Sequence, residues 1–132
     1  MTAGKAESKG PASSQQEIAD FTYVPNPSVP GGLAVGENRF ALRAESNALV
    51  DEGIRAGDLV VLEAHQNPED GETVVAVIGG KASVRRLYRE ATGSIRLEAQ
   101  GKKLPPILAG PADVEIRGRV IALIRKYQNI DP

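Results

Sequence analysis

The sequence predicts a mostly β domain that follows a disordered N-terminal arm. From about residue 39 onward, short runs rich in Val, Ile and Leu alternate with turns rich in Gly, Pro, Asn and Asp. This pattern is typical of strands joined by short loops. Helical periodicity is weak, because residues 48–52 are the one segment that resembles a helix, and they span one turn at most.

The composition is that of a small domain with an aliphatic core. The chain has 132 residues, of which 41% are hydrophobic and only 4% aromatic. It has no cysteine and a single histidine, His65, so disulfides, thiol catalysis and a histidine cluster are excluded, and we expect no metal and no cofactor. No apolar run approaches the ~18 residues of a membrane span, and no hydrophobic signal region is seen, so we expect a cytoplasmic protein without a membrane partner.

The N-terminal residues 1–37 are expected to lie outside the packed domain, which we place at residues 38–128. The first 20 residues are rich in Ala, Gly, Ser, Gln and Lys and have little to bury, which predicts disorder. Residues 21–37 contain three prolines and the pair Gly31-Gly32. They predict an extended connector with apolar anchors at Phe21, Tyr23 and Val24.

Six strands are expected within the domain, each rich in β-branched residues or alternating between apolar and polar positions. They are residues 39–45, 58–64, 72–78, 81–89, 94–99 and 114–125. Phe40, Leu42 and Ala44 share one face of the first strand, and Ile95 and Leu97 point inward from the fifth. The pair Gly79-Gly80 predicts a two-residue hairpin between the third and fourth strands.

Three segments, in this order, carry a family resemblance that covers roughly residues 39–126. The first has a strand ending at Ser46, then Gly53-Ile54, then Gly57-Asp58 leading into a strand; the second runs from Gly71 to Val84-Arg85-Arg86-Leu87; the third ends in Gly118-Arg119-Val120 and Arg125. Together they resemble the C-terminal, peptidase S24-like domain of the LexA/UmuD family. The resemblance implies a curled β-sheet or partial barrel, similar to that of LexA and signal peptidases.

The family's reaction is hydrolysis of a peptide bond in the domain's own N-terminal arm, in the SOS response to DNA damage. A serine attacks the carbonyl, and a neutral lysine takes the serine's proton. Family members pair as homodimers, partly through the closing strands, which correspond to residues 114–124 here. The resemblance also implies a recombinase filament or a DNA polymerase as partner.

The resemblance places Ser46 at the position of the nucleophile. The alternative is a serine that ends a strand and hydrogen-bonds to nearby backbone. Asn47 stands where the family has Met, and the stretch from Ser46 to Gly57-Asp58 is about two residues longer than in LexA and UmuD.

The same resemblance places Arg85 where the family has its general-base lysine. A guanidinium is not deprotonated in proteins, so Arg85 cannot act as a base. It can pair with an acid, orient a ligand, or be an ordinary strand arginine. Lys81 lies four residues away, roughly 13 Å along a strand, at a solvated turn. His65 lies in a polar loop.

The expected cleavage dipeptide is also weak. The family cuts an Ala-Gly or Cys-Gly bond in the arm, and Ala3-Gly4 is the one such pair there. A cut at this site would release almost nothing. Ala56-Gly57 and Ala109-Gly110 fall in expected turns of the domain itself.

We therefore expect a regulatory domain of the SOS-response type that dimerises or docks and has a degenerate self-cleavage site. One alternative is an active self-cleaving peptidase of the S24 family. Another is a small β-barrel binding module unrelated to peptidases, with a basic face formed by Arg85, Arg86, Arg89, Arg117 and Arg119. Sixteen basic residues against seventeen acidic ones give a net charge of −1, which argues against direct nucleic-acid binding.

Overall fold

The computed structural model describes residues 18–36, 38–64, 67–101 and 104–125. The predicted arm up to residue 17, with Ala3-Gly4, and His65 lie outside these ranges. Within them the chain forms strands and three short 3-10 helices, which confirms the mostly β class. The strands are β1 (Phe21–Val24), β2 (Arg39–Ala44), β3 (Leu59–Glu63), β4 (Thr73–Ile78), β5 (Lys81–Arg89), β6 (Ile95–Glu98), β7 (Ile107–Ala109) and β8 (Glu115–Ile124); the 3-10 helices are η2 (Gly31–Leu33), η3 (Val50–Glu52) and η4 (Pro111–Asp113).

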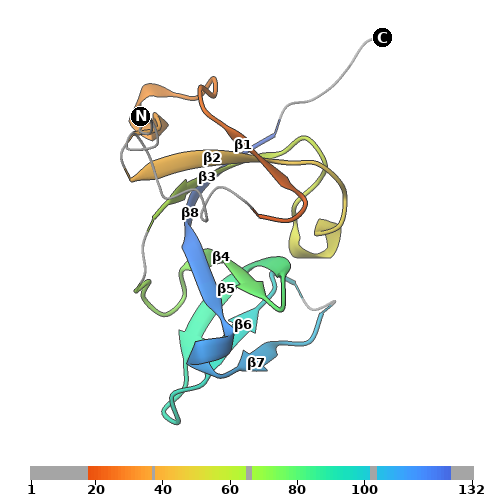
Figure 1. The fold of residues 1–132 in the computed structure, drawn as a ribbon, viewed down its shortest axis with the longest axis vertical. Helices are drawn as coiled ribbons and strands as arrows, with labels where there is room; N and C mark the ends of the chain where they lie inside the picture. The colour runs from red at the N-terminus through yellow and green to blue at the C-terminus, as the bar shows by residue number, and fades with distance from the viewer. Residues whose placement is uncertain (1–17, 37, 65–66, 102–103, 126–132) are drawn as a thin grey trace, which may run out of the picture.

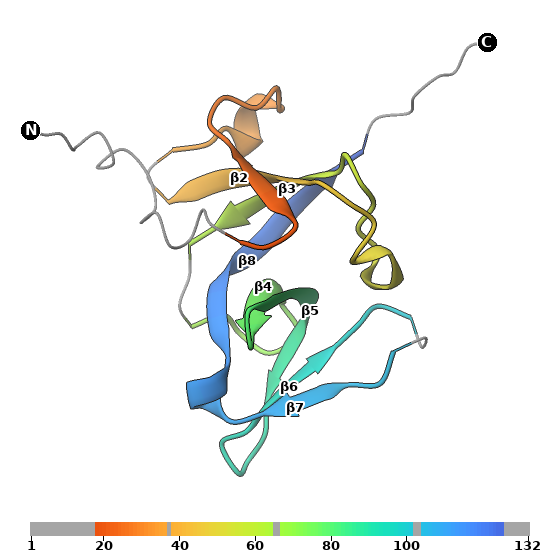
Figure 2. The ribbon, with the colours of Figure 1, turned by 45° about the vertical axis from the view of Figure 1, so that its right-hand side comes forward.

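All eight strands belong to one antiparallel sheet in the order β1-β2-β3-β8-β4-β5-β6-β7. The last strand therefore lies between two groups that precede it in the chain. It pairs with β3 through residues 119–124 and with β4 through residues 115–119. Figure 1 shows β1–β3 on one side and β4–β7 on the other, and Figure 2 shows β8 bending as it passes between them. The sheet is curled, as the resemblance implied.

The bend in β8 is accompanied by irregular pairing on both of its sides. The register shifts between Val61 and Leu62 on β3 and between Val75 and Ala76 on β4. Gly118 lies at this point, and a Cβ atom there would meet the carbonyl oxygen of Glu63 at 2.8 Å. The close approach of the two backbones thus requires glycine.

The core has two clusters: the first lies mainly on β2 and β3 but also includes Val75, Ala82 and Val84 of β4 and β5, and the second lies within the β4–β8 side of the sheet. The first cluster includes Phe40, Leu42, Ala44, Val60 and Leu62, and the second consists of Val74, Ala76, Leu87, Ile95 and Leu97. The inward faces expected for the 39–45 and 94–99 runs are therefore confirmed.

The expected strands are all present, with ends that differ by at most one residue. Gly79 and Gly80 form the predicted hairpin turn, both with positive φ (58° and 81°), which suits a turn of the I′ kind. The helix-like segment 48–52 is the 3-10 turn η3. β1 and β7 were not expected. β1 pairs with β2, Phe21 opposite Ala44, so the sheet begins inside the predicted connector.

In the described part of the chain, no helix is long and apolar enough to cross a membrane.

Candidate functional site

The segment between β2 and β3 carries Ser46 and η3, and the buried Asp58 fixes its far end. The Asp58 carboxylate accepts hydrogen bonds from the Arg55 backbone N–H at 2.7 Å and from Nε and Nη2 of Arg125 at 2.8 and 2.6 Å. Arg125 also donates to the Gly53 carbonyl at 3.0 Å. The Gly-Asp motif thus ties this segment to the end of β8.

Burial of Asp58 would by itself raise the pKa of this carboxyl group. The hydrogen bonds from the Arg125 guanidinium and the Arg55 backbone N–H favour the charged form, as do the positive charges of both side chains, and the net effect is a pKa below the usual value. Asp58 is therefore a charged, fully bonded anchor.

Ser46 makes its hydrogen bond within its own turn. Its half-buried side chain accepts the Ala48 backbone N–H through Oγ at 3.2 Å. It lines a small hollow together with Phe21 of β1, Leu49 and Ile54. This contact is the one that a strand-ending serine makes, and it does not activate the hydroxyl as a nucleophile.

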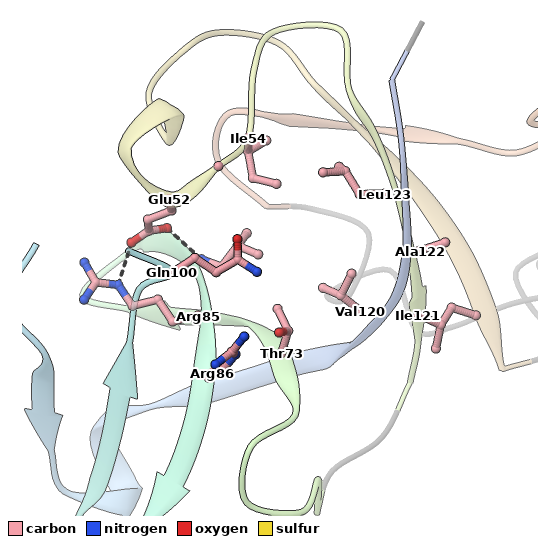
Figure 3. Close-up of a pocket in the computed structure, with 12 residues that line it drawn as sticks. Glu52, Ile54, Thr73, Arg85, Arg86, Gln100, Val120, Ile121, Ala122 and Leu123 are labelled. Atoms are coloured by element: carbon pink, nitrogen blue, oxygen red, sulfur yellow. Dashed lines mark hydrogen bonds and ion pairs between the residues drawn. The ribbon is translucent and has the colours of Figure 1, made fainter. Parts of the chain in front are cut away.

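Arg85, on β5, is buried and bonded through several of its donors. Nε donates to Oε2 of Glu52 at 2.6 Å, and Nη1 donates to the carbonyls of Pro105 at 3.0 Å and Leu97 at 3.4 Å. The other oxygen of Glu52, Oε1, accepts the Val84 backbone N–H at 2.7 Å. Figure 3 shows this carboxylate facing the guanidinium, with both of its bonds drawn. Arg85 therefore joins η3, β5, β6 and the loop before β7.

Glu52 is the member of this pair that the sequence did not reveal. It is separated from Arg85 by 33 positions, and its side chain is 4% exposed against 7% for the arginine. An acidic residue in a short helical turn normally faces solvent, so nothing local marks it as buried. A buried carboxylate needs a cation and further donors, and here it has both.

A hollow of about 220 Å³ lies between η3, β5 and β8 (Figure 3). Its polar walls include Glu52, Arg85, Arg86, Thr73 and Gln100, and its apolar wall is formed largely by residues 120–123 of β8. Ser46 does not line it. Among the described residues, Ile54 lines both this hollow and the smaller one at Ser46. The structure therefore places the two sequence-predicted site residues in separate hollows.

Four of the five arginines of the alternative basic face contact other protein groups, and Arg86 is exposed. Arg85 is buried against Glu52, Arg89 donates to the Pro68 carbonyl, and Arg117 pairs with Glu115 at 3.1 Å. Arg119 binds Glu63 at 2.7 Å and also Glu72. These contacts with protein groups weigh against the basic-face interpretation.

The Arg119 cluster lies where the two groups of strands meet. The Arg119 hydrogen bond holds the pKa of the Glu63 carboxyl below its usual value against the effect of burial, and Arg39 adds a second bond. The bonds to Glu63 and Glu72 in turn raise the pKa of Arg119.

No group of three or more His, Cys, Asp or Glu side chains suited to a metal ion occurs in the ranges that the structure describes.

Comparison with known proteins places this fold and site in a family. The chain matches the family described as Peptidase S24-like over residues 2–121. The chain belongs to the peptidase S24-like family. The S24-like match covers the sheet from β1 into β8, including Ser46, Glu52 and Arg85.

This S24-like chain is also similar to LexA repressors. It is 35% identical over 100 residues to that of Syntrophobacter fumaroxidans, 38% over 89 residues to that of Clostridium kluyveri and 39% over 87 residues to that of Pelotomaculum thermopropionicum. These matches cover 76%, 67% and 66% of the chain but 48%, 43% and 41% of the relatives, so the chain spans less than half the length of each. The resemblance to the LexA/UmuD family is thereby confirmed.

Proposed function

We propose that this chain is a LexA/UmuD-like regulatory domain that has lost self-cleavage and acts in the cytoplasm by dimerising or docking in an SOS-type response. The observation that carries the proposal is the environment of Arg85. At the place of the general base stands a guanidinium that cannot lose its proton and that is buried in an ion pair with Glu52.

No other described lysine is placed to act as the base. Lys81 is the one lysine in the described ranges, and it is exposed at the β4–β5 turn. A lysine acts as a general base only in its neutral form, which burial favours and exposure to water does not. This supports the degenerate site over the active peptidase.

The nucleophile position is open to a second interpretation. The segment from Ser46 to Gly57-Asp58 has about two residues too many for the family pattern. The surplus disappears if the family's Ser-Met pair is aligned with Ala48-Leu49 instead of Ser46-Asn47. Leu49 packs against the first core cluster, as an apolar residue at the methionine position would. In this alignment both catalytic positions are substituted, the serine by Ala48 and the lysine by Arg85.

Dimerisation is supported by the exposed end of β8. Its pairing with β4 ends at Arg119, while its pairing with β3 continues to Ile124. Within the described residues, 120–124 therefore have a strand neighbour on one side only, and Leu123 there is 42% exposed. A strand edge with an exposed apolar residue favours pairing with a second copy.

The proposed loss of cleavage is tested by intact-mass spectrometry. The purified chain is incubated at neutral and alkaline pH, with and without an activated recombinase filament, because alkaline pH favours a deprotonated base. We expect the full-length mass under every condition. A fragment that appears in the wild-type chain and is lost in Ser46→Ala would establish the active peptidase instead.

A further inference from the structure

The carboxylate of Glu52 has a role at this site beyond the pairing of one arginine. We propose that Glu52 is a positioning residue that holds any basic side chain at position 85 in its protonated form, so that restoring the family's lysine would not restore a general base. The inference rests on the proposed loss of cleavage, since it explains why a single reversion would leave the site inactive.

The position of the Glu52 carboxylate does not depend on Arg85 alone. Oε1 accepts the Val84 backbone N–H at 2.7 Å, and only Oε2 bonds to Nε of Arg85. Val84 precedes Arg85 on β5, and this strand is paired with β4 and β6. The carboxylate is thus held by backbone next to position 85, and it stays there when the side chain at that position changes.

Because the Glu52 carboxylate is buried, its charge determines which protonation state is favoured at position 85. The side chains of Glu52 and Arg85 are 4% and 7% exposed, so water screens their interaction little. A buried carboxylate that loses its cation is strongly destabilising. Glu52 therefore favours a charged partner at position 85.

A lysine introduced at position 85 would place its ammonium beside this carboxylate. The number of bonds from Cα to Nζ of lysine equals the number from Cα to Cζ of arginine, and Nε, the preceding atom, lies 2.6 Å from Glu52 Oε2. Burial disfavours a lysine's charge, but an anion within about 4–6 Å favours it. A carboxylate in direct contact outweighs the burial, and the amine stays protonated.

The experiment compares the titration of the introduced lysine in two variants, Arg85→Lys and Arg85→Lys/Glu52→Gln. Glutamine keeps an oxygen for the Val84 N–H but removes the charge. The pKa of the lysine is measured by NMR from its side-chain resonances as a function of pH. We expect a pKa at or above the ordinary value of about 10.4 in the single variant and a value at least one pH unit lower in the double variant.

Glu45→Gln, combined with Arg85→Lys, is the matched control, because it removes an exposed carboxylate from the same segment. Its lysine should titrate as in Arg85→Lys alone. Equal pKa values in the Glu52 variant and in this control would overturn the inference.

A second measurement guards against poor folding of the lysine variants. Glu52→Gln is introduced into the wild-type chain and into Arg85→Met, and the unfolding equilibrium constant is measured in urea. We expect the substitution to increase this constant at least tenfold in the wild-type background and to decrease it or leave it unchanged in Arg85→Met. Equal effects in both backgrounds would contradict the coupling of the two positions.

These readouts separate the inference from the proposed function. Cleavage by the wild-type chain would remove the proposed function but would leave the difference between the lysine pKa values intact. Equal lysine pKa values would remove the role of Glu52, whether or not the wild-type chain cleaves itself.

Discussion

At the scale of single residues, the site depends on two buried carboxylates that are each paired with an arginine. Glu52 accepts from Arg85 with one oxygen and from the Val84 backbone N–H with the other, whereas both oxygens of Asp58 accept from Arg125. Each pair joins segments far apart in the sequence. The first pair joins η3 to β5, and the second fixes the segment between β2 and β3 to the end of β8.

Asp58 predicts a loss of stability in acid. Its pKa is lowered in the folded chain, so its contribution is present above the unfolded value of about 3.9 and is lost as the pH falls through the folded value. We expect Asp58→Asn to lower the free energy of unfolding by about 2 kcal/mol at pH 7, because the hydrogen bonds to a charged carboxylate are weakened. The difference in the free energy of unfolding between wild type and Asp58→Asn should shrink progressively below roughly pH 5.

Urea unfolding at pH 7 and near pH 3 measures this effect, with Asp113→Asn at an exposed position as the control. A stability difference between wild type and Asp58→Asn that stays constant over this pH range would exclude a charged Asp58 as the anchor.

At the scale of elements, local pattern predicted the long strands, and tertiary context decided the rest. The runs at β2–β6 and β8 show alternation or β-branched enrichment that a single sequence reveals. β7 has three residues, too few for a period to be seen, and β1 has four; the two strands lie at the two edges of the sheet. Proline-rich context hid β1 inside the connector.

The site shows the same division between local and distant information. Arg85 could be singled out from the sequence, because the hairpin that presents it has a strong local signal. Its partner Glu52 was not visible, because only the folded sheet brings η3 against β5. The insertion of β8 between β3 and β4 was likewise beyond any local pattern.

Gly118 of β8 gives the prediction at this scale. A methyl group there would meet the Glu63 carbonyl oxygen at 2.8 Å, and this neighbour is backbone that cannot rotate away. We expect Gly118→Ala to lower the free energy of unfolding by about 2 kcal/mol, as overpacking does. Thermal and urea unfolding measure it.

Gly32→Ala is the matched control, because nothing lies within 4 Å of a Cβ at that position. Its free energy of unfolding should differ little from that of wild type. If Gly118→Ala behaved in the same way, β3 and β8 could not approach each other as closely as described.

At the scale of the whole molecule, the proposed dimer predicts a concentration-dependent mass. Analytical ultracentrifugation at tens of micromolar should show two copies for the wild-type chain. Leu123→Glu places a charge on the exposed end of β8 and should give a monomer, since a buried unpaired charge is costly.

Leu108→Glu on β7 is the control, because Leu108 is 65% exposed on a different edge of the sheet. It should leave the dimer intact. A wild-type chain that is monomeric at these concentrations, or a dimer unaffected by Leu123→Glu, would reject β8 as the interface.

The central place of β8 also constrains how the chain is made. Strands β3 and β4 both pair with β8, which is synthesised after the other seven strands. During translation, the growing chain therefore carries two unpaired strand edges. Such edges invite pairing with other chains. A chain that stops before residue 115 should therefore aggregate, instead of persisting as two half-sheets. A stop codon just before β8 should be as damaging as one near the start of the sheet.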